Sequence, residues 1–143
     1  MSPDEPDLTI RPYEPSDEAA VIDLWRRCGL VVPWNDPQHD IALKQLVNPE
    51  LFLVATAGGR PVGTVMAGYD GHRGAINYVG VDPELRRHGY GRQLMAAAEE
   101  LLRQRDCPKI NLHVRTSNTG VIAFYERLGY KLDPTVCLGK RLD

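Results

Sequence analysis

The first third of the chain carries apolar residues at helical spacing after one short alternating stretch. Alternation at 8–11 predicts a strand, which Pro12 ends because proline cannot donate to a β-ladder. A helix follows, and one buried face of it is predicted at the i, i+3, i+4 and i+7 positions Val21, Leu24, Trp25 and Cys28. Ser16 is placed to cap this helix. Asn35 or Asp36 is placed to cap a second helix, whose apolar side is expected to be Ile41, Leu43, Leu46 and Val47.

The period changes to that of strands from residue 51. Apolar runs at 51–56 and 61–67 flank the pair Gly58-Gly59, which is the pattern of a β-hairpin. A third run at 75–81 follows a short polar loop at 70–74. These three runs predict a meander of antiparallel strands.

Helical spacing returns after the third run and continues to about residue 105. A strand at 110–115 comes next, and the order strand, helix, strand predicts a right-handed crossover between parallel neighbours. Asn118 or Ser117 is placed to cap a last helix. Two short strands, 130–132 and 136–138, are expected to end the chain. The elements together predict an α/β (α+β) fold, with a mostly antiparallel sheet of six to seven strands and about four helices.

Length and composition narrow the class of protein. The 143 residues are enough for one domain, expected at 8–143 after a flexible, acidic and proline-rich tail at 1–7. A net charge of -2 argues against broad nucleic-acid binding, and no apolar run reaches the ~18 residues that suggest a membrane span. The three cysteines are odd in number and form no CxxC pair, which indicates neither a disulfide framework nor a zinc ribbon, so we expect a cytoplasmic location. The four scattered histidines have no metal-ligand spacing, so we expect no metal.

The stretch from Val81 to Arg92 has the composition of a phosphate-binding turn. Gly89 and Gly91 allow the backbone to turn tightly at the start of a helix, where N–H groups and the helix dipole attract anions. Arg86, Arg87 and Arg92 add guanidinium groups that match phosphate oxygens. The Walker pattern is absent, and Leu94 stands where a dinucleotide fingerprint needs its third glycine. A glycine-rich turn that binds nothing remains the alternative.

Two motifs in order carry a resemblance to a known family. Arg86-x-x-Gly89-x-Gly91 follows Val81-x-Pro83, and downstream come Asn118 and the segment 123–130, Ala-Phe-Tyr-Glu-Arg-Leu-Gly-Tyr. Their order and spacing resemble those of the GCN5-related N-acetyltransferase (GNAT) family. The resemblance implies the acyl-CoA N-acyltransferase fold and acetyl-CoA as donor. The cofactor-binding residues that it implies are Val79, Gly80, Val81, Arg86, Arg87, His88, Gly89, Tyr90, Gly91, Arg92 and Asn118.

The same resemblance suggests which residues carry the chemistry. Tyr125 occupies the tyrosine of the family's Y-x-x-x-G-[FY] motif, which implies that it protonates the departing thiolate. Its spacing alone indicates a core tyrosine. His113 stands where the family's ribosomal-protein alanine acetyltransferases carry a glutamate, and a neutral imidazole can accept the amine proton. A histidine on a strand is more often structural, and a water relay is open through residues at the expected acceptor mouth: Asp70, His72, Asn77 and Tyr78.

The function implied is direct acetyl transfer from acetyl-CoA to a primary amine of a small molecule or a peptide N-terminus. A non-catalytic acyl-CoA-binding or regulatory module on the same fold is the alternative, and an unrelated nucleotide-phosphate-binding domain is a more distant one. No general motif covers the acceptor side, so the acceptor stays open. The oligomeric state also stays open, a homodimer included.

Overall fold

The structure is a computed structural model that describes residues 7–143 of the chain. The predicted N-terminal tail therefore lies almost entirely outside the described residues. The chain divides into two compact units, which comprise residues 1–112 and 113–143. The single domain expected at 8–143 stays a prediction.

The first unit is built on one five-stranded sheet, with its strands in the order β1-β2-β3-β4-β5. Neighbouring strands are antiparallel from β1 to β4, and β4 pairs with β5 in parallel. The strands are β1 (Leu8–Pro12), β2 (Phe52–Ala57), β3 (Arg60–Tyr69), β4 (Gly74–Val81) and β5 (Ile110–Leu112). The hairpin at Gly58-Gly59 and the parallel pair predicted from the sequence are both confirmed.

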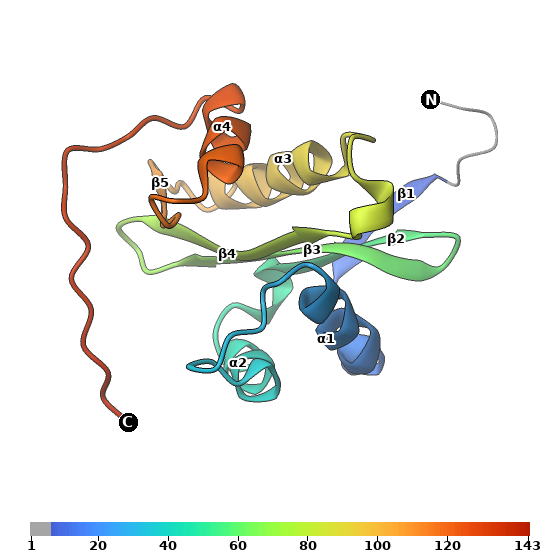
Figure 1. Cartoon of the computed structure of the whole chain (residues 1–143). Coiled ribbons are helices and arrows are strands. Elements are labelled where there is room, and N and C mark those ends of the chain that lie inside the picture. The colour runs from blue at the N-terminus through green and yellow to red at the C-terminus, as the bar shows by residue number, and fades with distance from the viewer. Residues whose placement is uncertain (1–6) are drawn as a thin grey trace. The chain divides into compact units, whose positions relative to one another are not determined.

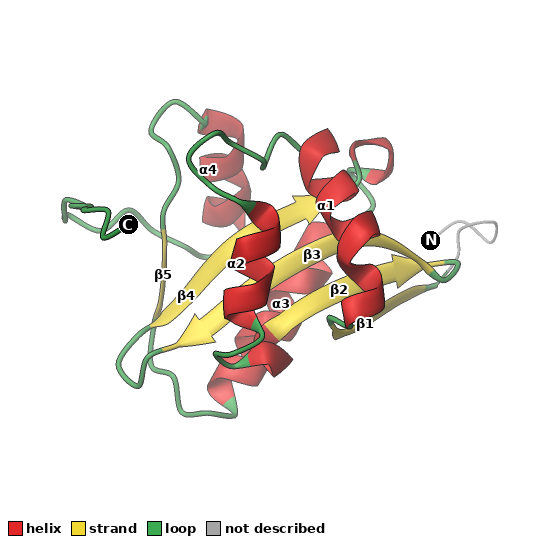
Figure 2. Cartoon of the chain, turned by 90° about the horizontal axis from the view of Figure 1, so that it is seen from below, coloured by secondary structure: helices red, strands yellow, loops and turns green. Residues whose placement is uncertain are grey.

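Helices cover both faces of this sheet. The longer helices are α1 (Glu18–Arg27), α2 (Pro37–Lys44) and α3 (Tyr90–Arg103), and short turns of 3₁₀ helix lie at η1 (Pro15–Asp17), η2 (Pro49–Leu51) and η3 (Pro83–Leu85). Helices α1 and α2 lie on one face and α3 on the other (Figures 1 and 2). Trp25 and Phe52 are buried in the core on the α1 side, while Leu94 and Leu102 are buried on α3. The apolar faces read from the sequence therefore form a layered core.

Of the two caps predicted for the first two helices, the one on α2 is confirmed and the one on α1 is wrong. Asp36 caps α2, because its Oδ1 accepts hydrogen bonds from the backbone N–H groups of Gln38 and His39. Ser16 does not cap α1: it lies within η1, and the N-cap position belongs to Asp17. The carboxylate of Asp17 instead binds the Arg11 guanidinium at 2.8 and 2.9 Å. The Asp17 side chain therefore pairs with Arg11 of β1 and makes no cap hydrogen bond to α1.

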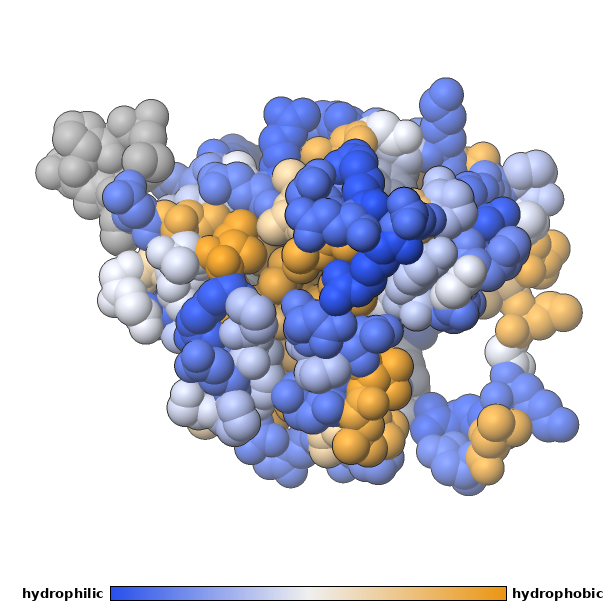
Figure 3. Space-filling model, turned by 180° about the vertical axis from the view of Figure 1, so that it is seen from behind, coloured by the Kyte–Doolittle hydropathy of each residue, from blue (hydrophilic) through white to orange (hydrophobic). Residues whose placement is uncertain are grey.

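Helix α2 is shorter than expected and leaves apolar side chains outside. It ends at Lys44, and Ile41 is buried as predicted. Leu46 and Val47 lie beyond the end of the helix, so the expectation that they belong to its apolar side is wrong, and Leu43, Leu46 and Val47 are all exposed. Seen from behind, the surface is mostly hydrophilic, and apolar side chains gather on it in separate patches (Figure 3).

The second unit contains one helix, α4 (Thr119–Arg127), among its described residues. Asn118 caps it, as predicted, by accepting a hydrogen bond from the backbone N–H of Val121. The strands expected at 130–132 and 136–138 are absent from the structure, so the sheet has five strands rather than six to seven. Leu132, Val136 and Leu138 are 84–97% exposed, and a run that buries no apolar face gains little from strand pairing. The mixed, mainly antiparallel fold class is nevertheless confirmed.

Candidate functional site

A β-bulge interrupts β4 near its middle. Thr64 of β3 faces Gly80, but Met66 faces Asn77, so β4 has one residue more than β3 across this interval. Tyr78 lies inside the bulge with φ +50°, a left-handed conformation that is uncommon for a residue other than glycine. The second half of β4 is therefore bent relative to the first.

Pairing between β4 and β5 ends just before this bulge. Ile76 and Leu112 form the last matched pair, so from 77 to 81 β4 has a neighbouring strand only on its β3 side within the described sheet. An unpaired strand edge presents N–H and C=O groups that an extended, amide-containing ligand can pair with. Three of the predicted cofactor-binding residues lie on this edge, namely Val79, Gly80 and Val81.

A buried network holds the bulge in place. The indole of Trp25 stacks on the Tyr78 ring with a centroid separation of 3.9 Å. The same indole donates a 2.9 Å hydrogen bond from Nε1 to the Thr64 hydroxyl, which donates in turn to the Tyr78 carbonyl at 2.8 Å. The Tyr78 hydroxyl donates to Asp40, and burial, followed by this hydrogen bond, raises the pKa of Tyr78. Both the backbone and the side chain of the strained residue are therefore fixed.

Close packing behind the edge explains Gly80. A Cβ placed there would approach the Leu30 Cδ1 atom to 3.0 Å and the Cys28 Sγ atom to 3.3 Å. The Cys28 thiol also donates to the Val81 carbonyl at 3.3 Å. The segment that follows α1 thus packs directly on the open half of β4.

The turn after β4 starts from a buried anchor. Asp82 is 1% exposed, accepts a hydrogen bond from the Glu84 amide and forms a 2.9 Å ion pair with Arg27. Burial by itself would raise the pKa of Asp82, but the hydrogen bonds from Arg27 and Glu84 outweigh it and hold the pKa below its usual range. The chain therefore enters the predicted phosphate-binding turn from a fixed point.

The turn itself brings backbone N–H groups together at the start of α3. Arg87 and Gly89 have φ values of +72° and +78°, which lie in the left-handed region. Where left-handed and right-handed residues alternate, successive backbone N–H groups form a concave array that attracts anions. The first N–H groups of α3 have no partner within the helix, and Gly89 has no side chain that caps them. Arg86, Arg87, His88 and Arg92 are exposed here, whereas the ring of Tyr90 is buried. Tyr90 therefore offers its backbone N–H rather than its ring.

The second unit contains the other predicted site residues. Tyr125 is buried and makes edge-to-face contacts with Phe124 and Tyr130, with centroid separations of 5.1 and 5.7 Å. Burial raises the pKa of Tyr125 to about 12, so its hydroxyl keeps its proton at neutral pH. The side chain of Asn118 is used in the helix cap. His113 is exposed and follows the end of β5, so the expectation that it lies on a strand is wrong.

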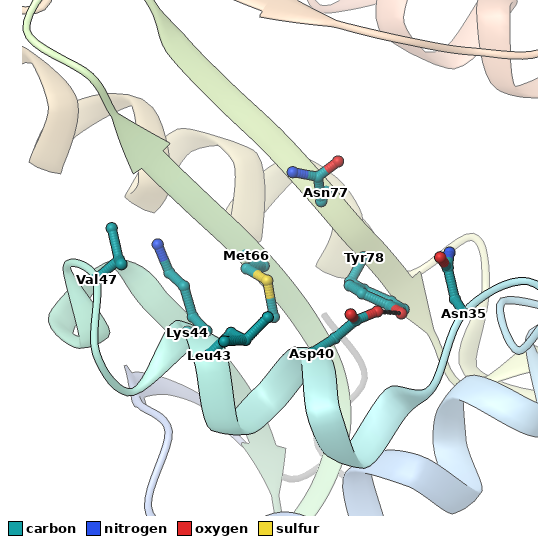
Figure 4. Close-up of a pocket in the computed structure, with 8 residues that line it drawn as sticks. All are labelled: Asn35, Asp40, Leu43, Lys44, Val47, Met66, Asn77 and Tyr78. Carbon is teal, nitrogen blue, oxygen red and sulfur yellow. Dashed lines mark hydrogen bonds between the residues drawn. The ribbon is translucent and has the colours of Figure 1, made fainter. Parts of the chain in front are cut away.

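A pocket of about 390 Å³ lies in the first unit, between α2 and strands β3 and β4 (Figure 4). It is lined by Asn35, Asp40, Leu43, Lys44, Val47, Met66, Asn77 and Tyr78. Two residues predicted at the acceptor mouth, Asn77 and Tyr78, are therefore among its walls. Asp70 and His72 are not: Asp70 accepts hydrogen bonds from the backbone N–H groups of His72 and Arg73 in the turn after β3.

Asp40 and Lys44 belong to no motif in the sequence. The available signal was a pair of opposite charges at i and i+4 in a helix with an irregular apolar side. Such a pair usually lies on a solvated face. Only the packing of α2 against β3 shows that it lines a pocket.

Comparison with known proteins identifies the family. The model of the acetyltransferase (GNAT) family matches residues 18–130. The chain belongs to the GNAT family. An acetyltransferase of Yersinia enterocolitica is 49% identical over 135 residues, which cover 94% of this chain and 96% of that protein. The open β4 edge and the turn before α3 thus occur in a GNAT chain whose relatives are named acetyltransferases.

Solved structures support the same fold. Ard1 from Thermoplasma volcanium superposes with a TM-score of 0.76 and 28% identity, covering 88% of this GNAT chain and 84% of that one. A ribosomal-protein alanine N-acetyltransferase from Escherichia coli superposes with a TM-score of 0.72 and 26% identity, covering 86% and 77%. PaiA N-acetyltransferase from Thermoplasma acidophilum, solved with coenzyme A, has a TM-score of 0.74 at 18% identity and covers 91% and 93%.

Two further observations concern residues 7–143 only. None of the helices there is long and apolar enough to cross a bilayer. Histidine, cysteine, aspartate and glutamate side chains do not gather there in a group of three or more that suits a metal ion.

Proposed function

We propose that this GNAT protein transfers the acetyl group of acetyl-CoA directly to a primary amine of a small molecule or a peptide N-terminus. One observation carries the proposal: the unpaired half of β4 leads straight into a left-handed turn rich in N–H groups at the start of α3. The edge suits the amide-containing pantetheine arm and the turn suits a pyrophosphate. The complex of PaiA with coenzyme A, which has the same fold, supports this assignment of the donor.

The donor site would be shared between backbone and side chains. The N–H groups of residues 87–92 would hold the pyrophosphate, and the exposed guanidinium groups of Arg86, Arg87 and Arg92 would supply the positive charge. The exposed imidazole of His88 would add a hydrogen-bond donor. Val79, Gly80 and Val81 would pair with the pantetheine amides. A backbone N–H on this edge would also stabilise the oxyanion that forms on the thioester carbonyl.

The transfer needs a neutral amine and a proton for the thiolate. The amine nitrogen bonds to the carbonyl carbon, the carbon–sulfur bond breaks, and the thiolate takes up a proton while the amine gives one up. Tyr125 is proposed as the acid, because its motif is that of the family and its hydroxyl is protonated at neutral pH. His113 is proposed as the base, and as an exposed imidazole it can return the proton to water.

Thiol release from acetyl-CoA tests the proposal, with amines, amino acids and peptide N-termini as acceptors. Tyr125→Phe should lower kcat at least about 10-fold and leave KM for acetyl-CoA nearly unchanged, because general acid catalysis typically contributes about 10²–10⁴-fold. Tyr69→Phe, which changes a tyrosine outside the proposed site, is the matched control. Unaltered kcat in Tyr125→Phe would exclude the acid role. Tight binding of CoA with no thiol release for any amine would favour a non-catalytic acyl-CoA-binding module.

A further inference from the structure

One wall of the pocket between α2 and the sheet carries both a cationic and an anionic side chain. Asp40 and Lys44 lie one turn apart on α2, and both side chains line the cavity (Figure 4). Residues four apart on a helix lie on the same face, about 6 Å from each other along the axis. The α2 wall of the pocket therefore has an anionic end at Asp40 and a cationic end at Lys44.

Lys44 is a buried cation with unused donors. Its residue is 9% exposed, and its Nζ donates one hydrogen bond to the Ala67 carbonyl on β3. An ammonium group has three N–H donors. Among the described residues, no carboxylate lies close enough to the Lys44 ammonium group, within 4 Å, to form an ion pair with it. Burial lowers the pKa of Lys44, and the negative charge of Glu50 opposes this only in part. Binding an anion would relieve the cost of keeping this charge out of water.

Asp40 forms the other end of the pocket. Its Oδ2 accepts the hydrogen bond from the Tyr78 hydroxyl, and Oδ1 has no protein donor among residues 7–143. A carboxylate accepts up to about four hydrogen bonds, so Oδ1 is available to an ammonium or amine group. The amides of Asn35 and Asn77 line the same cavity. Leu43 and Met66 supply apolar walls between Asp40 and Lys44, and Val47 lies beyond Lys44 (Figure 4).

The anionic end adjoins the open edge of β4. Asn77 is the first residue of β4 beyond its pairing with β5, and Tyr78 forms the bulge beside it. Lys44 lies further along the sheet, because its partner Ala67 faces Ile76. An amine held at Asp40 would thus be at the end of the pocket nearest the edge where the thioester is proposed to bind.

We propose that the acceptor is a small amino acid, with its amine at Asp40 and its carboxylate at Lys44. The inference rests on the proposed function, because it assigns the acceptor class of that same site. A polyamine would bring a positive charge to Lys44, and a peptide N-terminus would leave Lys44 without a carboxylate near the amine. Either of these acceptors leaves a buried charge unmatched, whereas an amino acid pairs with both.

Direct binding tests the assignment without requiring turnover. Isothermal titration in the presence of saturating CoA compares L-leucine with L-leucinamide and 3-methylbutylamine, which keep the amine and the apolar part but lack the carboxylate. A β- and a γ-amino acid, each with its amide and its decarboxylated amine, extend the comparison to other charge separations. At least one amino acid should bind about 10-fold or more tightly than its two analogues, because an unmatched buried charge costs at least one tenfold step in affinity.

Two variants locate the charges. Lys44→Met keeps the apolar stem, and it should weaken amino-acid binding about 10- to 100-fold while leaving the decarboxylated amine within about 2-fold. Asp40→Asn keeps an acceptor for Tyr78 and should weaken both ligands, because both use the amine end. Lys140→Met, on an exposed lysine outside the pocket, is the matched control. Thermal melting of each variant verifies that it folds.

Three results would overturn the inference. They are equal binding of amino acids and their amides to the wild-type protein, a loss in Lys44→Met that is the same for all three ligand types, and no amino-acid binding at millimolar concentration. The first and third need no variant. If polyamines or peptides are acetylated while amino acids neither bind nor react, the acceptor class is wrong and the acetyltransferase proposal stands. If amino acids bind but no acceptor releases thiol, the catalytic proposal fails instead.

Discussion

Replacing Thr64 by valine tests whether the buried network holds the β4 bulge. Thr64 is fully buried, and its hydroxyl bonds both the Trp25 indole and the Tyr78 carbonyl. Valine has nearly the same shape and removes both hydrogen bonds at once. Two buried polar groups, one N–H and one C=O, are then left without partners.

The expected loss follows from those two groups. Each unsatisfied buried group costs about 1–3 kcal/mol, and the extra buried methyl group offsets part of this, so the free energy of unfolding should fall by about 2–5 kcal/mol. At about 3 °C per kcal/mol for a chain of this size, the Tm should fall by about 6–15 °C. The KM for acetyl-CoA should also rise, because the carbonyl of Tyr78 loses the bond that fixes the bulge.

Urea unfolding followed by far-UV circular dichroism measures the loss. Thr56→Val is the matched control: Thr56 is a buried threonine on β2, and the structure shows no hydrogen bond of its hydroxyl with any described residue. It should change stability by less than about 1 kcal/mol. Thr64→Ser keeps the hydroxyl and should recover most of the loss. If Thr64→Val is no less stable than Thr56→Val, the network does not hold the bulge.

Two further predictions concern the turn and the response to acid. Gly89→Ala and Gly59→Ala both place a Cβ in open space at φ near +77°, so each variant should lose about 1–2 kcal/mol of stability. Only Gly89→Ala should weaken CoA binding, by about 10-fold in calorimetry. Equal CoA binding by the two variants would contradict a role for the turn. The hydrogen bond from Arg11 lowers the pKa of Asp17, so its stabilisation is present above about pH 4 and is lost as the pH falls through the folded-state pKa. Asp17→Asn should therefore flatten the acid limb of stability against pH in urea titrations, whereas Asp23→Asn, on an exposed ion pair, should leave that limb unchanged.

Local signals in the sequence predicted most of the elements. The helical spacing of Val21, Leu24 and Trp25 and the hairpin at Gly58-Gly59 concern residues within a few positions of each other, so the pattern itself carries the information. The caps at Asp36 and Asn118 follow for the same reason, because each binds a backbone N–H two or three residues away. Gly89, Gly91 and the arginines around the start of α3 likewise lie in one short segment.

Other features depend on partners that are distant in the chain. Trp25 and Thr64 are 39 residues apart, and the bulge at Tyr78 depends on both, although no glycine marks its left-handed backbone. Within the described sheet, the second half of β4 has no strand on its other side because β5 is only three residues long.

Periodicity and neighbouring residues specify the helices, the strands of the sheet and the phosphate-binding composition of the turn. The position of Asp40 and Lys44 in a pocket follows from the tertiary packing instead, since the burial of a charge depends on what packs over it. The strands expected at 130–132 and 136–138 failed for a related reason: alternation gives a segment strand character, but pairing needs a strand edge and an apolar face to cover.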